Sequence, residues 1–66
     1  MQIVLNGRTM EAPDVATVAA LLESLALGTK KVAVEVNGEI VPRSRWNDFR
    51  LSLGDRAEIV RAIGGG

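Results

Sequence analysis

Residues 32–41 read Val-Ala-Val-Glu-Val-Asn-Gly-Glu-Ile-Val, and this stretch decides the fold. Its first half alternates, so a strand over residues 32–36 turns one face toward a core and Glu35 toward water. The core-facing residues are Val32, Val34 and Val36. Asn37-Gly38 is the strongest two-residue hairpin signal, because a type I′ turn needs positive φ at both central positions. A second strand therefore returns until Pro42, which ends it because proline has no N–H to donate.

The N-terminus repeats this hairpin pattern. Residues 2–5 are apolar and rich in β-formers, and Asn6-Gly7 is a second hairpin signal. Residues 8–12 form the returning strand, and Pro13 ends it. Two hairpins therefore flank the segment between them.

That segment predicts one helix. Thr17 suits the N-cap, because its hydroxyl can accept a hydrogen bond from a free amide of the first turn. Apolar residues then follow at i, i+3, i+4 and i+7, which is the spacing of a one-faced helix. They are Val18, Leu21, Leu22 and Leu25. Gly28 is expected at the left-handed cap just past the helix end.

The C-terminal part continues the alternation of turns and strands. Residues 43–48 predict a turn or a short helical turn, with Trp46 as a lid over one edge of the core. Leu51 and Leu53 form a short alternating stretch that suggests a further short strand. Gly54-Asp55 makes a turn, and residues 57–63 form the last strand.

This order of elements predicts an α+β domain. One helix packs across one face of a mixed sheet of four to five strands. Residues 1–63 are expected to form the domain, and residues 64–66 a flexible C-terminal tail. The 47% hydrophobic content fits a small core that holds without disulfides.

Composition narrows the function classes. The 66 residues include no cysteine and no histidine, which excludes a Cys/His zinc site, a thiol nucleophile and a Ser–His pair. Eight basic and eight acidic residues cancel, which argues against nucleic-acid binding. No apolar run approaches the length of a membrane span, and Met1 leads directly into a strand, not a signal peptide. A cytoplasmic location is therefore expected.

Gly64-Gly65-Gly66 follows the apolar last strand. Glycine has no Cβ, so this segment can enter a slot too narrow for other residues. Its one chemical group is the α-carboxylate of Gly66, a poor electrophile that another protein would have to activate. A frayed end is the alternative, because chain termini are often disordered. The carboxylates elsewhere show no pairing typical of an acid–base site, so a carrier or protein substrate is favoured over an enzyme.

A docking surface is predicted beside the tail. If Glu58 and Gln2 face water, Val60 and Ala62 share the face of Glu58, and Val4 shares the face of Gln2. Should the first and last strands be neighbours, an exposed apolar patch results, and such a patch beside a reactive terminus suggests docking. The patch consists of Val4, Val60 and Ala62.

Several short motifs together resemble a known family. They are Asn37-Gly38-Glu39-Ile40-Val41-Pro42-Arg43, Trp46, Gly54-Asp55, Glu58-Ile59-Val60 and the terminal glycines. In this pattern the whole chain resembles the sulfur-carrier protein of thiamine (thiazole) biosynthesis. A terminal Gly-Gly is shared by all ubiquitin-like carriers, whereas the Asn-Gly, Val-Pro-Arg and Trp run is more specific. Three glycines stand here in place of a bare pair, which leaves the reactive end unchanged.

The resemblance implies a ubiquitin-like β-grasp fold and a route for sulfur. An E1-like adenylyltransferase would use ATP to adenylate the carboxylate of Gly66. Sulfur from a cysteine-derived persulfide, supplied by a cysteine desulfurase or a sulfurtransferase, would replace AMP and leave a thiocarboxylate. Thiazole synthase would receive that sulfur, while Gly64 and Gly65 thread the partners' active sites. The chain itself is expected to be a monomer, not an enzyme, with no cofactor and no metal.

Three alternatives stay open at this point. Another sulfur carrier, such as the small subunit of molybdopterin synthase, would share fold and chemistry but is usually longer. A β-grasp binding module, for RNA or for protein, would not need a free terminus, and zero net charge with one tryptophan opposes RNA. A conjugating modifier like ubiquitin would also use the terminal carboxylate.

Overall fold

The computed structural model describes residues 1–14, 16–28 and 30–61. The elements follow one another as β1 (Gln2–Leu5), β2 (Arg8–Glu11), α1 (Val18–Ser24), β3 (Val32–Val36), β4 (Glu39–Ile40), the 3-10 helix η1 (Arg43–Arg45) and β5 (Arg56–Arg61). The last strand was predicted over residues 57–63, and residues 62 and 63 lie outside the described part of the chain.

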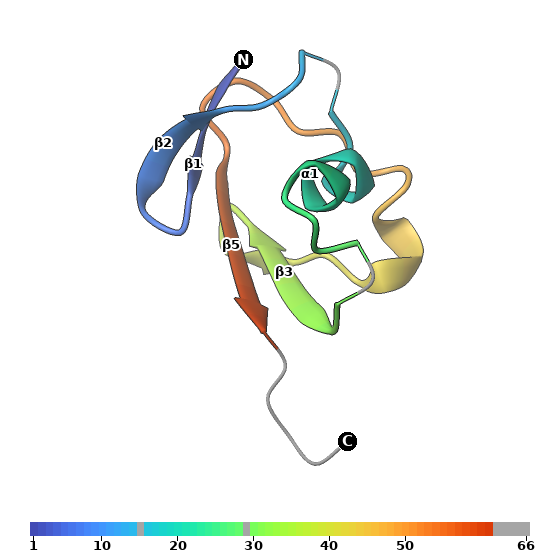
Figure 1. Ribbon diagram of the computed structural model, residues 1–66. Coiled ribbons are helices and arrows are strands. Elements are labelled where there is room, and N and C mark those ends of the chain that lie inside the picture. The colour runs from blue at the N-terminus through green and yellow to red at the C-terminus, as the bar shows by residue number, and fades with distance from the viewer. Residues whose placement is uncertain (15, 29, 62–66) are drawn as a thin grey trace.

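The five strands form one mixed sheet in the order β2-β1-β5-β3-β4. Both hairpins are antiparallel, and β5 lies between them, parallel to β1 and antiparallel to β3. Helix α1 covers one face of the sheet (Figure 1), which leaves the opposite face without a covering element among the described residues. The predicted α+β fold, a β-grasp, is therefore confirmed.

Both hairpin turns have the predicted geometry. Asn6 and Asn37 adopt φ values of 48° and 52°, and the glycines that follow them adopt 83° and 86°. Positive φ at two successive residues is the signature of the type I′ turn, which suits the twist of a two-residue hairpin. Asparagine tolerates the left-handed region better than most residues, and glycine has no steric penalty there.

The helix begins as predicted but ends differently. The Thr17 hydroxyl accepts a hydrogen bond from the Ala20 amide at 3.1 Å. At the other end Ala26, not Gly28, takes the left-handed position, with φ 59°. The Leu27 amide donates to the Leu22 carbonyl at 2.8 Å, and the Ala26 amide to the Glu23 carbonyl at 3.0 Å. These two bonds form a Schellman cap, so the prediction of Gly28 as the cap was wrong.

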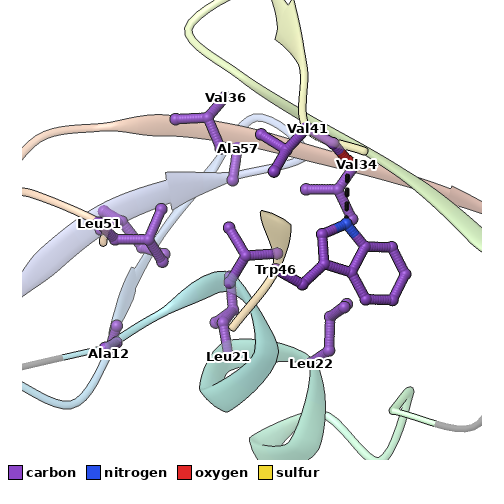
Figure 2. Close-up of a cluster of buried hydrophobic side chains, with 12 residues drawn as sticks. Ala12, Leu21, Leu22, Val34, Val36, Val41, Trp46, Leu51 and Ala57 are labelled. Atoms are coloured by element: carbon purple, nitrogen blue, oxygen red, sulfur yellow. Dashed lines mark hydrogen bonds between the residues drawn. The ribbon is translucent and has the colours of Figure 1, made fainter. Parts of the chain in front are cut away.

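The core lies between α1 and the inner face of the sheet. Leu21 and Leu22 approach from the helix, and Val34, Val36 and Ala57 approach from the strands (Figure 2). The predicted apolar stripe of the helix and the predicted alternation in the strands are thus confirmed at the centre of the core.

Trp46 closes one edge of this core, as predicted. Its side chain is buried, and its indole N–H donates to the Val41 carbonyl at 2.9 Å (Figure 2). That bond satisfies the one polar atom of the ring, which would otherwise be costly to bury. The residue follows η1, so the expected short helical turn is also present.

The short strand suggested at Leu51 and Leu53 is absent from the described residues. Leu51 is buried, whereas Leu53 is 74% exposed in the turn that precedes β5. The backbone here forms hydrogen bonds with the residues at the start of the helix. The Leu51 amide donates to the Ala16 carbonyl, and the Val18 amide donates to the Phe49 carbonyl. Hydrogen bonds to the helix N-terminus therefore replace a sheet ladder, so this expectation was wrong.

Replacing Ala26 by glycine should stabilise the fold. A residue with a Cβ is strained at the left-handed cap, so Ala26→Gly is expected to raise the free energy of unfolding by about 0.5–1 kcal/mol, after the larger unfolded-state entropy of glycine is subtracted. Urea denaturation measures the change. Ala20→Gly, inside the helix, is the matched control and should lower the same free energy by about 1 kcal/mol. Equal losses in the two variants would contradict the cap assignment.

Candidate functional site

The predicted reactive end follows directly from the central strand. β5 ends at Arg61, and the chain continues from there to Gly66. The predicted site residues Ala62, Gly64, Gly65 and Gly66 lie outside the described residues. The structure therefore defines the strand and the surface from which the tail departs.

The two faces of β5 differ as the alternation predicts. Ala57 is buried and Ile59 is half-buried against the core, whereas Glu58 is exposed and Val60 is 61% exposed. Val60 therefore lies on the uncovered face of the sheet. The adjacency of the first and last strands, on which the predicted patch depends, is also present.

The register separates the two described members of that patch. Val4 pairs with Arg56, so Val60 lies four residues further along β5 on the same face. At about 3.3 Å per residue the two side chains are roughly 13 Å apart along the sheet. Arg56 lies beside Val4, and Glu58 lies between Arg56 and Val60 on the same face of β5. Val60 is thus near the end of β5, and Val4, which is half-buried, is near its beginning.

Ile40 is an exposed apolar residue that the sequence analysis did not single out. Its side chain is 64% exposed, and it pairs with Glu35 across the β3–β4 hairpin. Glu35 also pairs with Glu58, and Ala33 pairs with Val60, so all five share the uncovered face. The signal was present in the sequence, since the Asn-Gly turn places Ile40 opposite a residue already expected to face water.

Two glutamates therefore stand opposite each other on this face. Like charges directly across a sheet are slightly destabilising. A shallow hollow of about 450 Å³ lies beside them. It is lined by Glu35, Asn37, Gly38, Arg56 and Glu58. The part of the uncovered face on β3, β4 and β5 thus combines exposed apolar side chains with two acidic groups and one basic group.

A larger hollow of about 890 Å³ lies elsewhere, between α1 and η1. Its lining includes Leu22, Glu23, Arg43 and Trp46. The guanidinium carbon of Arg43 is 5.1 Å from the centre of the Trp46 ring, a cation–π contact on the edge of the core. This hollow is on the helix side of the sheet, so it is separate from the face that carries Val60.

The α-ammonium of Met1 is held by carboxylates at the end of the sheet opposite to the exit of β5. It lies 3.0 Å from Asp14 and 3.2 Å from Glu11. Hydrogen bonds from Asp14 and then Glu11 raise the pKa of this group above its ordinary value of 8.0. The ammonium therefore carries its full charge below pH 8, and its contacts weaken as the pH rises through the raised pKa.

The described part of the chain contains neither a cluster of metal-ligating side chains nor a membrane-spanning helix. Among residues 1–14, 16–28 and 30–61, no three potential metal-ligating side chains come together. None of the described helices is long and apolar enough to cross a membrane.

Comparison with known proteins assigns this arrangement to a family. The model of the ThiS family matches residues 3–66. The chain belongs to the ThiS family. The ThiS sulfur carrier protein of Escherichia coli is 35% identical over 66 residues, with the whole of both chains covered. The ThiS sulfur carrier protein of Bacillus subtilis is 40% identical over 63 residues, which cover 94% of this chain and 96% of that protein.

A solved structure and a longer relative add to this picture. The crystal structure of the thiamine biosynthesis protein ThiS from Geobacter metallireducens superposes with a TM-score of 0.86 at 29% identity, over all of both chains. A thiazole synthase of Paramagnetospirillum magneticum is 46% identical over 66 residues, but the chain spans only 20% of that protein. The predicted class, a sulfur carrier protein of thiamine biosynthesis, is confirmed by the ThiS assignment.

Proposed function

We propose that this ThiS chain carries sulfur as a thiocarboxylate on Gly66. One observation carries the proposal: the central strand of the sheet ends at Arg61, and after two more residues the sequence continues as three glycines. A carboxylate at that position is held by a rigid domain yet is reached through residues without side chains. Gly64 and Gly65 supply the narrow approach to a partner's active site.

The chemistry needs an activating partner. An E1-like adenylyltransferase would transfer AMP from ATP to the carboxylate of Gly66 and release pyrophosphate. The terminal sulfur of a protein persulfide, from a cysteine desulfurase or a sulfurtransferase, would then attack the acyl carbon and expel AMP. A thiol would cleave the resulting acyl disulfide, which frees the thiocarboxylate and forms a disulfide with the donor. The chain itself acts as a monomeric substrate in the cytoplasm and not as a catalyst.

Thiazole synthase is the proposed acceptor of the sulfur. A stretch as long as this whole chain, and 46% identical to it, lies within a protein named thiazole synthase. That relationship supports a close functional link between the carrier and this enzyme.

The proposed carrier has two parts. The flexible unit is residues 64–66, and the folded unit is residues 1–63.

The uncovered face of the sheet is the proposed docking surface. Val60 lies on it near the end of β5, where a bound partner would also receive the tail. Val4 and Ala62 complete the proposed surface, Val4 at its start and Ala62 at the first position after the strand. Exposed apolar side chains beside a reactive end favour docking over a neutral surface.

Mass spectrometry tests the proposed modification. After incubation with ATP, a persulfide donor and the activating enzyme, the intact chain should gain about 16 Da, because one oxygen is exchanged for sulfur. The control omits ATP and should show no gain. An unchanged mass with all components present would count against the proposal.

A side chain in the tail should block activation without affecting the fold. Gly65→Val is expected to lower ATP–pyrophosphate exchange by at least roughly a hundred-fold, since a misplacement of about 1 Å at a reacting group has that effect. Its urea midpoint should equal that of the unmodified chain. Exchange at the normal rate would contradict the threading role of Gly65.

A charge on the docking surface should weaken partner binding selectively. Val60→Asp is expected to raise the KM for the carrier in adenylation by roughly ten-fold or more, because it places a desolvated charge at the contact. Leu53→Asp is the matched control: Leu53 is equally apolar and 74% exposed, but it lies in the turn before β5. Both variants should keep their stability within about 0.5 kcal/mol. Equal KM changes would remove Val60 from the docking surface.

A further inference from the structure

The side chain of Asn6 bonds to both backbone groups of Ile59. Its Oδ1 atom accepts a hydrogen bond from the Ile59 amide at 2.8 Å, and its Nδ2 atom donates to the Ile59 carbonyl at 3.2 Å. Asn6 belongs to the first hairpin turn, whereas Ile59 lies in the second half of β5. A turn near the start of the chain thus holds the strand that leads to its end.

These bonds continue a ladder after its strand has ended. The parallel pairing of β1 with β5 stops at Leu5 and Ala57, and the Asn6 amide donates to the Ala57 carbonyl at 2.9 Å. The next bond of a parallel ladder would join the Ile59 amide to the carbonyl of Asn6. The chain turns away at this point, so the side-chain carboxamide takes the place of a peptide unit. It offers the same acceptor and donor.

The two sides of β5 are held over different lengths. β3 accompanies β5 as far as the pair of Val32 with Arg61. On the opposite side, among the residues that the structure describes, the hairpin of β1 and β2 reaches no further than Ile59, and only through Asn6. The residue after Ile59 is Val60, which the proposed docking surface uses. Asn6 therefore supports β5 just before the surface and the tail that partners would engage.

We infer that Asn6 is a positioning residue for delivery of the C-terminal carboxylate. By extending the ladder to Ile59, it holds the second half of β5 on the side away from β3 and keeps Val60 on the docking face. Without this support, the end of β5 would be held by β3 alone and would fray more often, so a partner would have to order it on binding. Because ordering backbone is entropically unfavourable, binding would weaken while the chemical step stayed the same. The inference rests on the proposed function.

Asparagine is suited to this task for two separate reasons. It tolerates the φ of 48° that the turn needs, and it carries the carboxamide that the ladder needs. Glycine keeps the first property and loses the second, because Gly-Gly also forms type I′ turns. Asn6→Gly therefore removes the support and leaves the turn intact.

The second hairpin provides a matched control. Asn37 has the same turn position with φ 52°, and its Oδ1 atom accepts from the Arg56 amide at 3.0 Å. Its Nδ2 atom donates to Asp55 at 3.0 Å. Asn37→Gly thus removes the same kind of bonds from the beginning of β5, far from its exit. The two variants change the same residue type in the same turn type.

Amide exchange in the free protein tests the structural half of the inference. Asn6→Gly should accelerate exchange of the Ile59 amide by about ten-fold or more relative to the Leu22 amide in the helix. Asn37→Gly should accelerate exchange of the Arg56 amide by a similar factor and leave the Ile59 amide unchanged. Asn6→Asp keeps the acceptor for the Ile59 amide but loses the donor, so its effect should be intermediate. Equal exchange of Ile59 in Asn6→Gly and Asn37→Gly would overturn the support by Asn6.

Adenylation kinetics test the functional half. Asn6→Gly should raise the KM for the carrier roughly five-fold, which corresponds to reordering about one residue of backbone, with kcat changed less than about two-fold. Asn37→Gly should leave KM within about two-fold. Asn6→Asp should raise the KM for the carrier less than Asn6→Gly does, because it keeps the acceptor for the Ile59 amide. An unchanged KM in Asn6→Gly, or equal rises in both glycine variants, would overturn the positioning role, whereas no adenylation of the unmodified chain would overturn the proposed function itself.

Discussion

The pairing of β5 between two hairpins is the constraint on which the rest of the structure depends. Each hairpin forms from neighbouring residues, but neither can bury a core by itself. β5 joins them, parallel to β1 on one side and antiparallel to β3 on the other. Its inner face then contributes Ala57 to the centre of the core (Figure 2). The last strand in sequence is thus the middle strand in space.

This arrangement separates stability from chemistry. The buried residues lie between α1 and the inner face of the sheet, and the three terminal glycines, whose carboxylate is proposed to react, follow the central strand in the sequence. β3 pairs with β5 as far as Arg61, and on the other side β1 and the side chain of Asn6 hold it as far as Ile59. In the proposed function, a folded docking surface would present a terminus that visits several active sites.

The range of the interaction explains most outcomes of the predictions, and the local cap at the end of the helix is the exception. The Asn-Gly turns and the Thr17 cap depend on bonds within a few residues, and they were predicted correctly. The cap at Ala26 was missed because glycine is the usual residue there, whereas hydrogen bonds to Leu22 and Glu23 hold an alanine in the strained position. The stretch around Leu51 was misjudged because its backbone partners, Ala16 and Val18, are distant in sequence.

The sequence by itself determined the two hairpins, the helix with its N-cap and the last strand, together with the inner and outer residues of the strands, because these depend on alternation, turn chemistry and composition. Only the tertiary structure decided the register of β1 against β5, which places Val4 beside Arg56 and well before Val60. It also decided that the side chain of Asn6 bonds to Ile59. These features join segments far apart in the chain, and no local pattern specifies which residues meet when two hairpins close around one strand.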